Sequence, residues 1–328
     1  MIIMAMTAFE LFGVLKLDAT DFERGLDRAE GRVGRIVGGG LATAAKVGIA
    51  AIGAATTAVA AFGKASMNEA SSFESAFTGV KKTTELTAEE YDELATWIMD
   101  ASTKMASSKE SIAGTMEIAG QLGIDGVNDL ETFAKTMVML GDTTNLSSEE
   151  AASSLAKFMN ITGDGAESAD RIGSSIVDLG NHFATTESDI VGMATRLASA
   201  GTIAGLSATD ILGLSTAMSS VGINAEAGGT AMSTILTKIG RAIDSGDAKL
   251  ATYAETAGMS AEQFVDAWKT DPTQALSAFI VGLDGVIDSG GNVTGILDDL
   301  GIKGIRETNT VKSLALASDV LAAEVNTA

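Results

Sequence analysis

His182 is the only histidine of the chain, and it lies among the hydroxyl and carboxylate groups of the stretch LGNHFATTESDI. An imidazole beside a hydroxyl and a carboxylate is the residue set of a nucleophilic triad. The same residues also fit the start of a helix, with Thr186 as the N-cap and Asp189 three residues later. This second interpretation explains the acids as well, because carboxylates are favoured at the positive end of a helix dipole. We therefore predict a joint between two helices here, with His182 in the connection and no catalytic residue.

No other pattern in the chain is typical of a catalytic or cofactor-binding site. With no cysteine and one histidine, thiolate sites, disulfides and histidine-based metal clusters are excluded. Sequences of the phosphate-binding loop, zincin, nucleophile-elbow and EF-hand types are absent. Glu74, in Phe73-Glu74-Ser75, faintly resembles the Glu-Ser start of lytic transglycosylases, which keeps a cell-wall hydrolase as an alternative. The rest of that signature is missing, so we predict a solvated helical carboxylate, no enzyme, no cofactor and no metal.

The composition favours an all-α protein that does not bind nucleic acid. The 328 residues include 37 glycines but one proline, and 46% of them are hydrophobic while only 5% are aromatic. Through Lys64 the chain carries seven basic and six acidic residues, whereas the remainder carries 15 basic and 37 acidic residues. Because neutralisation of phosphates by Lys and Arg supplies most nucleic-acid affinity, this acidic remainder excludes specific nucleic-acid binding.

The N-terminal segment, positions 1–65, differs in character from the rest of the chain. Within residues 1–35, LFGVLKLD alternates as a short strand would, and Thr20–Glu23 then forms a capping box that opens a charged helix. Residues 36–65 form a predicted Gly/Ala-rich apolar helix. Its uncharged run, Val47–Gly63, falls just short of the roughly 20 residues that a membrane span needs.

Small residues recur along this apolar segment and suggest that it associates with copies of itself. The glycines of this hypothesis are Gly34, Gly38, Gly48 and Gly53. Small side chains let helix backbones approach closely, either in lipid or in a homo-oligomeric bundle. A resident transmembrane helix and an ordinary buried helix are the two alternatives for the segment.

Helix-start sequences recur from Thr87 onward at a nearly constant spacing. Each places a capping side chain three residues before a carboxylate or a glutamine. The predicted N-caps are Thr87, Ser107, Asn128, Ser147, Thr186, Ser207, Ser260 and Asp271. Pro272 follows the last of them at the first helical position, where its missing N–H costs nothing. Glycines after apolar blocks predict the helix ends; they are Gly123, Gly141, Gly163, Gly201, Gly222 and Gly258.

These patterns predict an all-α fold, in which a domain of short capped helices follows the Gly/Ala-rich helix. The domain spans residues 66–310, and residues 311–328 begin a further helix. A pitch of about 20 residues per helix is similar to that of helical repeats. Because no residue-level repeat accompanies it, we predict a compact multi-helix domain rather than a solenoid.

An ordered set of motifs resembles the conserved core of phage tail tape-measure proteins. From residue 179 onward the motifs are LGN, TTESDI, MATRLASAG, GLSATDIL and SVGINAEAGGTAMSTIL. Upstream, LGDTTNL, SEEAA and the segment ASSFE at residues 70–74 also match. The resemblance covers roughly residues 10–245, and no single motif in it is a chemical signature.

The resemblance implies a structural role. Tape-measure proteins occupy the lumen of the tail tube in several copies, set the length of the tail and leave ahead of the DNA during infection. The implied partners are further copies of the chain in a small bundle, tail-tube and tail-tip proteins, assembly chaperones and the host membrane. The implied locations are the tail lumen of the virion and, before assembly, the host cytoplasm. Family members are usually longer, so we expect residues 1–328 to be part of a longer product or a short prophage version.

A membrane-active helical protein, either pore-forming or a secreted effector, is the alternative function. In that case residues 36–63 insert into a bilayer and the acidic helices form a soluble cap. Leakage of liposomes caused by a peptide of residues 30–66, without any tail component, would favour this alternative. An inert peptide would remove its main support.

Overall fold

A computed structural model describes residues 71–317 of the chain. The predictions for residues 1–35 and 36–65, including Gly34, Gly38, Gly48 and Gly53, lie outside the described residues. Every regular element within residues 71–317 is a helix, so the prediction of an all-α fold is confirmed there. Residues 72–317 cluster as one unit.

The helices are short and follow one another through brief links. A helix over residues 71–83 comes first. The next elements are α3 (Ala88–Lys104), α4 (Lys109–Gln121), α5 (Val127–Thr143), α6 (Ser148–Thr162), the 3-10 helix η1 (Ala166–Ser168), α7 (Ala169–His182), α8 (Glu187–Ala204), α9 (Ala208–Ser220) and α10 (Ala225–Ser245). The last five are α11 (Lys249–Thr256), α12 (Ala261–Thr270), α13 (Pro272–Asp288), α14 (Val293–Asp299) and α15 (Ile305–Ala315).

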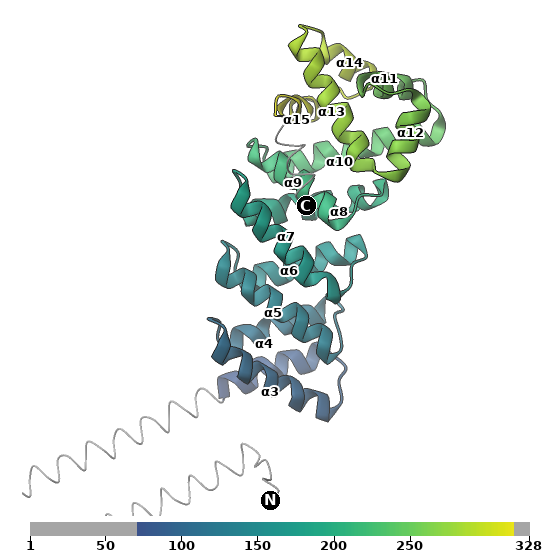
Figure 1. Cartoon of the computed structure of the whole chain (residues 1–328). Coiled ribbons are helices and arrows are strands. Elements are labelled where there is room, and N and C mark those ends of the chain that lie inside the picture. Colours follow the sequence, from purple (N-terminus) through teal and green to yellow (C-terminus); the bar gives the residue numbers. More distant parts are fainter. Residues whose placement is uncertain (1–70, 318–328) are drawn as a thin grey trace, which may run out of the picture. The chain divides into compact units, whose positions relative to one another are not determined.

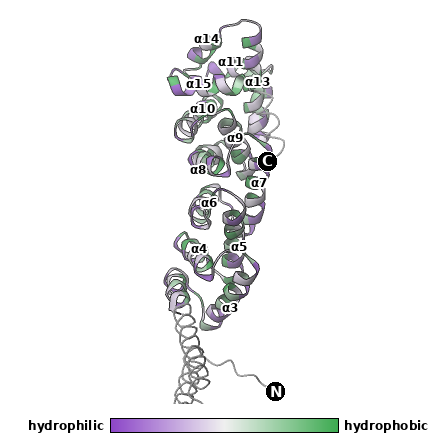
Figure 2. Ribbon diagram, turned by 90° about the vertical axis from the view of Figure 1, so that its left-hand side faces the viewer, coloured by the Kyte–Doolittle hydropathy of each residue, from purple (hydrophilic) through white to green (hydrophobic). Residues whose placement is uncertain are grey.

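Helices α3 to α10 form a two-layered stack (Figures 1 and 2). One layer contains α4, α6, α8 and α10, each packed on the next, and the other contains α3, α5, α7 and α9. Each hairpin thus contacts mainly its neighbours in sequence, which is the architecture of an α-solenoid. The expectation of a compact domain without solenoid character is corrected for this part of the chain. The hairpins share a pattern of apolar positions rather than identical residues, and for this reason no repeat is visible in the sequence.

The remaining helices cover the α10 end of the stack. Helices α11, α12 and α13 pack on one another, and α15 returns to contact α9, α10 and α13 (Figure 1). Val311 and Leu314 of α15 are fully buried. The domain boundary expected between residues 310 and 311 therefore falls inside a packed helix that begins at Ile305.

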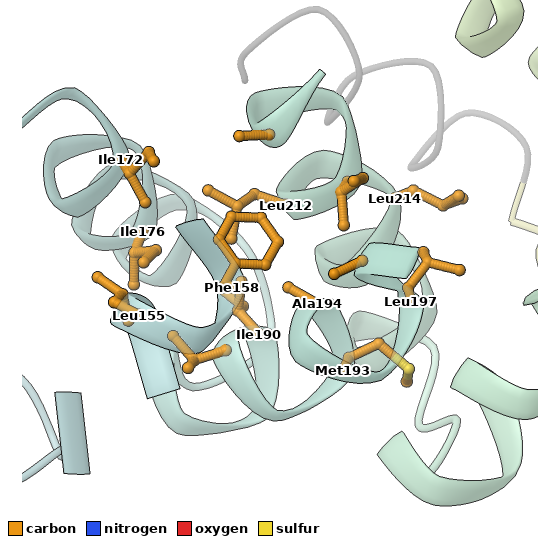
Figure 3. Packing of buried hydrophobic residues seen from close by; sticks show 14 of the residues in the cluster. Leu155, Phe158, Ile172, Ile176, Ile190, Met193, Ala194, Leu197, Leu212 and Leu214 are labelled. Atoms are coloured by element: carbon orange, nitrogen blue, oxygen red, sulfur yellow. The ribbon is translucent and has the colours of Figure 1, made fainter. Parts of the chain in front are cut away.

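One continuous apolar core, from Phe73 to Ala315, runs between the layers. It forms because each helix carries apolar residues at three- and four-residue spacing, as with Ile190, Met193 and Leu197 on α8, which are all fully buried. Figure 3 shows Phe158 of α6 pointing toward apolar side chains of α8 and α9. The core is thus shared between successive hairpins and does not belong to any one of them.

Several glycines inside helices mark places where two segments approach closely. Gly141 and Gly201, predicted as helix ends, lie within α5 and α8. A Cβ atom at Gly141 would lie 2.7 Å from the backbone nitrogen of Ser148, and one at Gly201 would lie 2.7 Å from the Ile211 side chain. These two residues permit packing rather than ending a helix. The end of α8 is instead at Gly205, which adopts the left-handed conformation.

Two glycines of α13 differ in their distance from neighbouring backbone, and this difference predicts opposite effects on stability when each is replaced by alanine. A Cβ atom at Gly282 would overlap the carbonyl oxygen of Thr256, whereas one at Gly285 meets nothing within 4 Å. We expect Gly282→Ala to lower the free energy of unfolding by about 1–3 kcal/mol through overpacking. Gly285→Ala, the matched control, should raise it by roughly 0.5–1 kcal/mol because alanine is the better helix former. Urea denaturation of the full chain measures both, and equal effects of the two substitutions would contradict the close packing.

Candidate functional site

His182 is the last residue of α7, not part of the connection that the sequence predicted. Its Nδ1 atom lies 2.8 Å from the carbonyl oxygen of Asp178 and 3.1 Å from the carboxylate of the same residue. The nearby hydroxyls bond elsewhere: Thr185 donates to Ser219, and Thr186 donates to Asp189. The imidazole itself is exposed at the end of the helix. This geometry does not assemble a nucleophile with a base.

Glu74, the second candidate for chemistry, lies on the helix over residues 71–83. Its side chain is exposed, and its carbonyl oxygen accepts a bond of 2.7 Å from the Thr78 hydroxyl. Among residues 71–317, no group of three or more His, Cys, Asp or Glu is arranged to hold a metal ion. None of the helices in that range is long and apolar enough to cross a membrane.

Most of the predicted N-caps occupy that position in the structure. The six that do so, each accepting a hydrogen bond from the backbone N–H of the third helical residue, are Thr87, Ser147, Thr186, Ser207, Ser260 and Asp271. At Thr87, Ser147, Ser207 and Ser260 the third helical residue also bonds back to the cap, which completes a capping box.

Two predicted N-caps were wrong. The cap of α4 is Ser108 instead of Ser107, and the cap of α5 is Gly126, which places Asn128 inside the first turn of that helix. Ser107 has a different partner, because its hydroxyl lies 3.0 Å from the Asp142 carboxylate. The caps Asn224 and Asn292 were missed since neither has an acid or glutamine three residues later.

Polar contacts join the links of successive hairpins. The carboxylate of Asp142, at the end of α5, accepts bonds from Ser107 and from the backbone of Ala106 before α4. Asn145, in the link after α5, accepts a bond of 3.1 Å from the backbone N–H of Ser188 in α8. Thr185, before α8, donates to Ser219 at the end of α9 at 2.7 Å. We call these contacts the inter-hairpin ladder.

The inter-hairpin ladder gives a structural role to residues of two motifs, LGDTTNL and TTESDI. Asp142 and Asn145 belong to LGDTTNL, and Thr185 and Ser188 belong to TTESDI. Their side chains or backbone groups fix one hairpin against the next. The ladder could not be predicted from the sequence, because its partners lie 34 to 43 residues apart.

Two open grooves of opposite charge are the strongest candidates for recognition. The acidic groove lies between α3 and α5 and is lined by Asp92, Glu93, Thr96, Trp97, Asp100 and Glu131. Partial burial, and then the neighbouring charge of Glu93, raise the pKa of Glu131. The basic groove lies between α8 and α10 and is lined by Arg196, Thr230, Ser233, Thr234, Thr237, Lys238 and Arg241. Neither groove was predicted, since each combines residues from helices that are not consecutive.

Comparison with known proteins identifies a family for the chain. A family model described as phage-related minor tail protein matches residues 95–300. No curated protein and no solved structure matches the chain. The matched range runs from α3 to the end of α14, so it contains the stack, the inter-hairpin ladder and most of the helices that cover the α10 end.

The capping boxes predict how stability depends on pH. Hydrogen bonds from the backbone and hydroxyl of Thr87 lower the pKa of Glu90, and those of Ser147 do the same for Glu150. Because the folded pKa lies below the unfolded value near 4.5, this stabilisation is complete above that value. It is lost as the pH falls through the folded pKa.

We expect Glu90→Gln to lower the melting temperature slightly at pH 7 and to have a smaller effect at pH 3, because protonation of the glutamate as the pH falls removes the charge-assisted bond. Glutamine keeps the shape of the cap but loses the charge-assisted bond. Glu89→Gln is the control, since it removes a charge from the same turn without removing a capping bond. A difference between wild type and Glu90→Gln that is equal at both pH values would contradict this account.

Proposed function

The chain belongs to the phage-related minor tail protein family, and from this premise we propose that it acts as a tape-measure protein of the phage tail. A structural role in the virion tail, in contact with other tail components, follows from the family itself. The finer proposal is that the protein occupies the lumen of the tail tube, sets tail length and leaves during genome ejection. We further propose that this role is not enzymatic.

The observation that carries the proposal is the family match over the stack, whose motifs make structural contacts. The residues by which the chain resembles tape-measure proteins hold hairpins together through the inter-hairpin ladder. Exposed carboxylates dominate the described surface. Such a surface does not bind phosphates, so it suits a protein in a tail lumen through which DNA later passes.

The geometry of the stack also bears on which part of a tape-measure protein can measure length. Each hairpin uses about 40 residues, and stacking it on the next adds only about 8–10 Å along the layer. A continuous helix of the same length spans about 60 Å. The stack is therefore an inefficient ruler, and we propose that extended helical segments outside it do the measuring.

In this proposal residues 71–317 are a folded head that makes the assembly contacts. Its partners are tail-tube and tail-tip proteins, assembly chaperones in the host cytoplasm before assembly, and further copies of the chain. The Gly/Ala-rich segment, residues 36–65, supplies a second contact between copies and meets the host membrane during ejection. These partners are proposed from the family and from the residue types of that segment.

The ruler predicts a proportional change in tail length. An in-frame deletion of a known number of residues, taken from a helical segment outside residues 71–317 in the complete gene, should shorten the tails by about 1.5 Å per deleted residue. Negative-stain electron microscopy of assembled particles measures the length. A virus carrying Gly285→Ala in the chain is the control, because the substitution leaves the number of residues unchanged.

Tails of normal length from the deletion virus would contradict the ruler and leave only the coarser structural role. Leakage of liposomes by the peptide of residues 30–66 would then favour the membrane-active alternative. Absence of all tails would mean that the deleted segment is needed for assembly, and a series of shorter deletions then decides whether length follows residue number.

A further inference from the structure

The basic groove is unusual on this surface because no carboxylate lines it. Acidic residues outnumber basic ones more than twofold within residues 71–317. Yet Arg196 of α8 and Lys238 and Arg241 of α10 line the groove together, and none of the three forms an ion pair with another residue of the described range. Three cations that line one groove without a carboxylate among its lining residues make the groove suited to an anionic occupant.

Three of the four hydroxyl groups that line the groove are already used as donors within α10. Thr230, Thr234 and Thr237 each donate to the carbonyl oxygen four residues earlier in α10. Their outward lone pairs can then only accept hydrogen bonds. Lys238 donates to the carbonyl oxygen of Gly301, which holds its charge in place beside the groove. Arg196 and Arg241 offer the guanidinium groups, which are the donors best suited to carboxylates.

The acidic groove has the complementary composition. Asp92, Glu93 and Glu131 have no cationic partner among the described residues, and only Asp100 is paired, with Lys104 of the same helix. The four carboxylates line the groove together with the half-buried Trp97, a residue type enriched in protein interfaces. Burial and the charge of Glu93 oppose the ionisation of Glu131, and a cation placed in the groove would relieve this opposition.

We propose that the two grooves are the two halves of one interface, in which the basic groove of one copy receives the acidic groove of another copy of this chain. Charge complementarity identifies the occupant. The basic groove offers three cations and the acidic groove offers four carboxylates, and each groove is an open surface formed by two helices. This contact goes beyond the ruler role, because it forms whether or not the protein measures tails.

The positions of the grooves decide the geometry of this contact. Helices α3 and α5 belong to one layer of the stack, and α8 and α10 belong to the other (Figure 2). One copy therefore presents its acidic and basic grooves on different layers, and the contact is heterologous. Such contacts continue from copy to copy until they close a ring or extend as a filament. Copies lie side by side and shifted along the stack.

A cross-linking experiment tests the contact in the full chain, which has no cysteine of its own. Thr96→Cys labels the acidic groove and Thr237→Cys labels the basic groove; both positions line their grooves. After mild oxidation, a mixture of the two variants should give a disulfide-linked dimer in several-fold excess over either variant alone. The homodimers formed by each variant alone are the internal reference for association through other parts of the chain.

Salt and charge reversal make the test specific for the grooves. The yield of the disulfide-linked heterodimer should decrease strongly between about 0.1 and 1 M salt, because the Debye length falls from about 10 Å to about 3 Å. Arg196→Glu with Arg241→Glu in the Thr237→Cys chain should lower its yield at least about tenfold, because like charges then face each other. Asp92→Arg with Glu93→Arg in the Thr96→Cys chain should restore it.

The matched control is Lys157→Glu with Lys269→Glu, which makes the same change in charge at exposed positions outside both grooves. It should leave the yield unchanged, and circular dichroism verifies that every variant is folded. A heterodimer no more abundant than the homodimers would overturn the proposal. So would an equal loss in the control, which would indicate an effect of net charge alone, and so would a failure of the paired reversals to restore the yield.

Discussion

Each hairpin of the stack has apolar residues on faces that only the neighbouring hairpins can cover, and this constraint organises residues 71–317. A helix such as α8 buries side chains against both α6 and α10 within its layer and against α9 across the layers. A single hairpin would leave much of this surface in water, so the stability of each depends on the next. Glycines such as Gly141 and Gly201 let the segments come close enough for the core to be continuous.

Polar residues then fix the spacing and the register that apolar burial leaves free. Capping side chains satisfy the first N–H groups of the helices, which would otherwise lack partners. The inter-hairpin ladder adds bonds between links that are distant in sequence, through Asp142, Asn145 and Thr185. The residues of LGDTTNL and TTESDI that form these bonds are thus used by the fold. The site that remains for recognition is the surface of the stack.

The distribution of charge on that surface connects the fold with assembly. Carboxylates prevail over most of the described range and disfavour contact with nucleic acid. Between α8 and α10, however, three cations gather without carboxylates, and the groove between α3 and α5 collects acids around Trp97. In the proposed role the protein works in several copies among other tail subunits, and it then needs contacts that are specific but reversible. Complementary charged grooves provide specificity and rapid association more than they provide affinity.

Local chemistry in the sequence determined the helices, because capping and apolar spacing act within one or two turns. Thr87, Ser147, Ser207 and Asp271 were predictable as N-caps for this reason, and so was the structural role of Thr186 beside His182. Only the tertiary structure decided which helices share a layer, that Gly141 packs on Ser148 instead of ending a helix, and that Arg196 of α8 and Arg241 of α10 line one groove. These relations join residues from different helices, and they depend on how apolar faces of similar composition pair. That choice is made by the shape and close packing of whole hairpins.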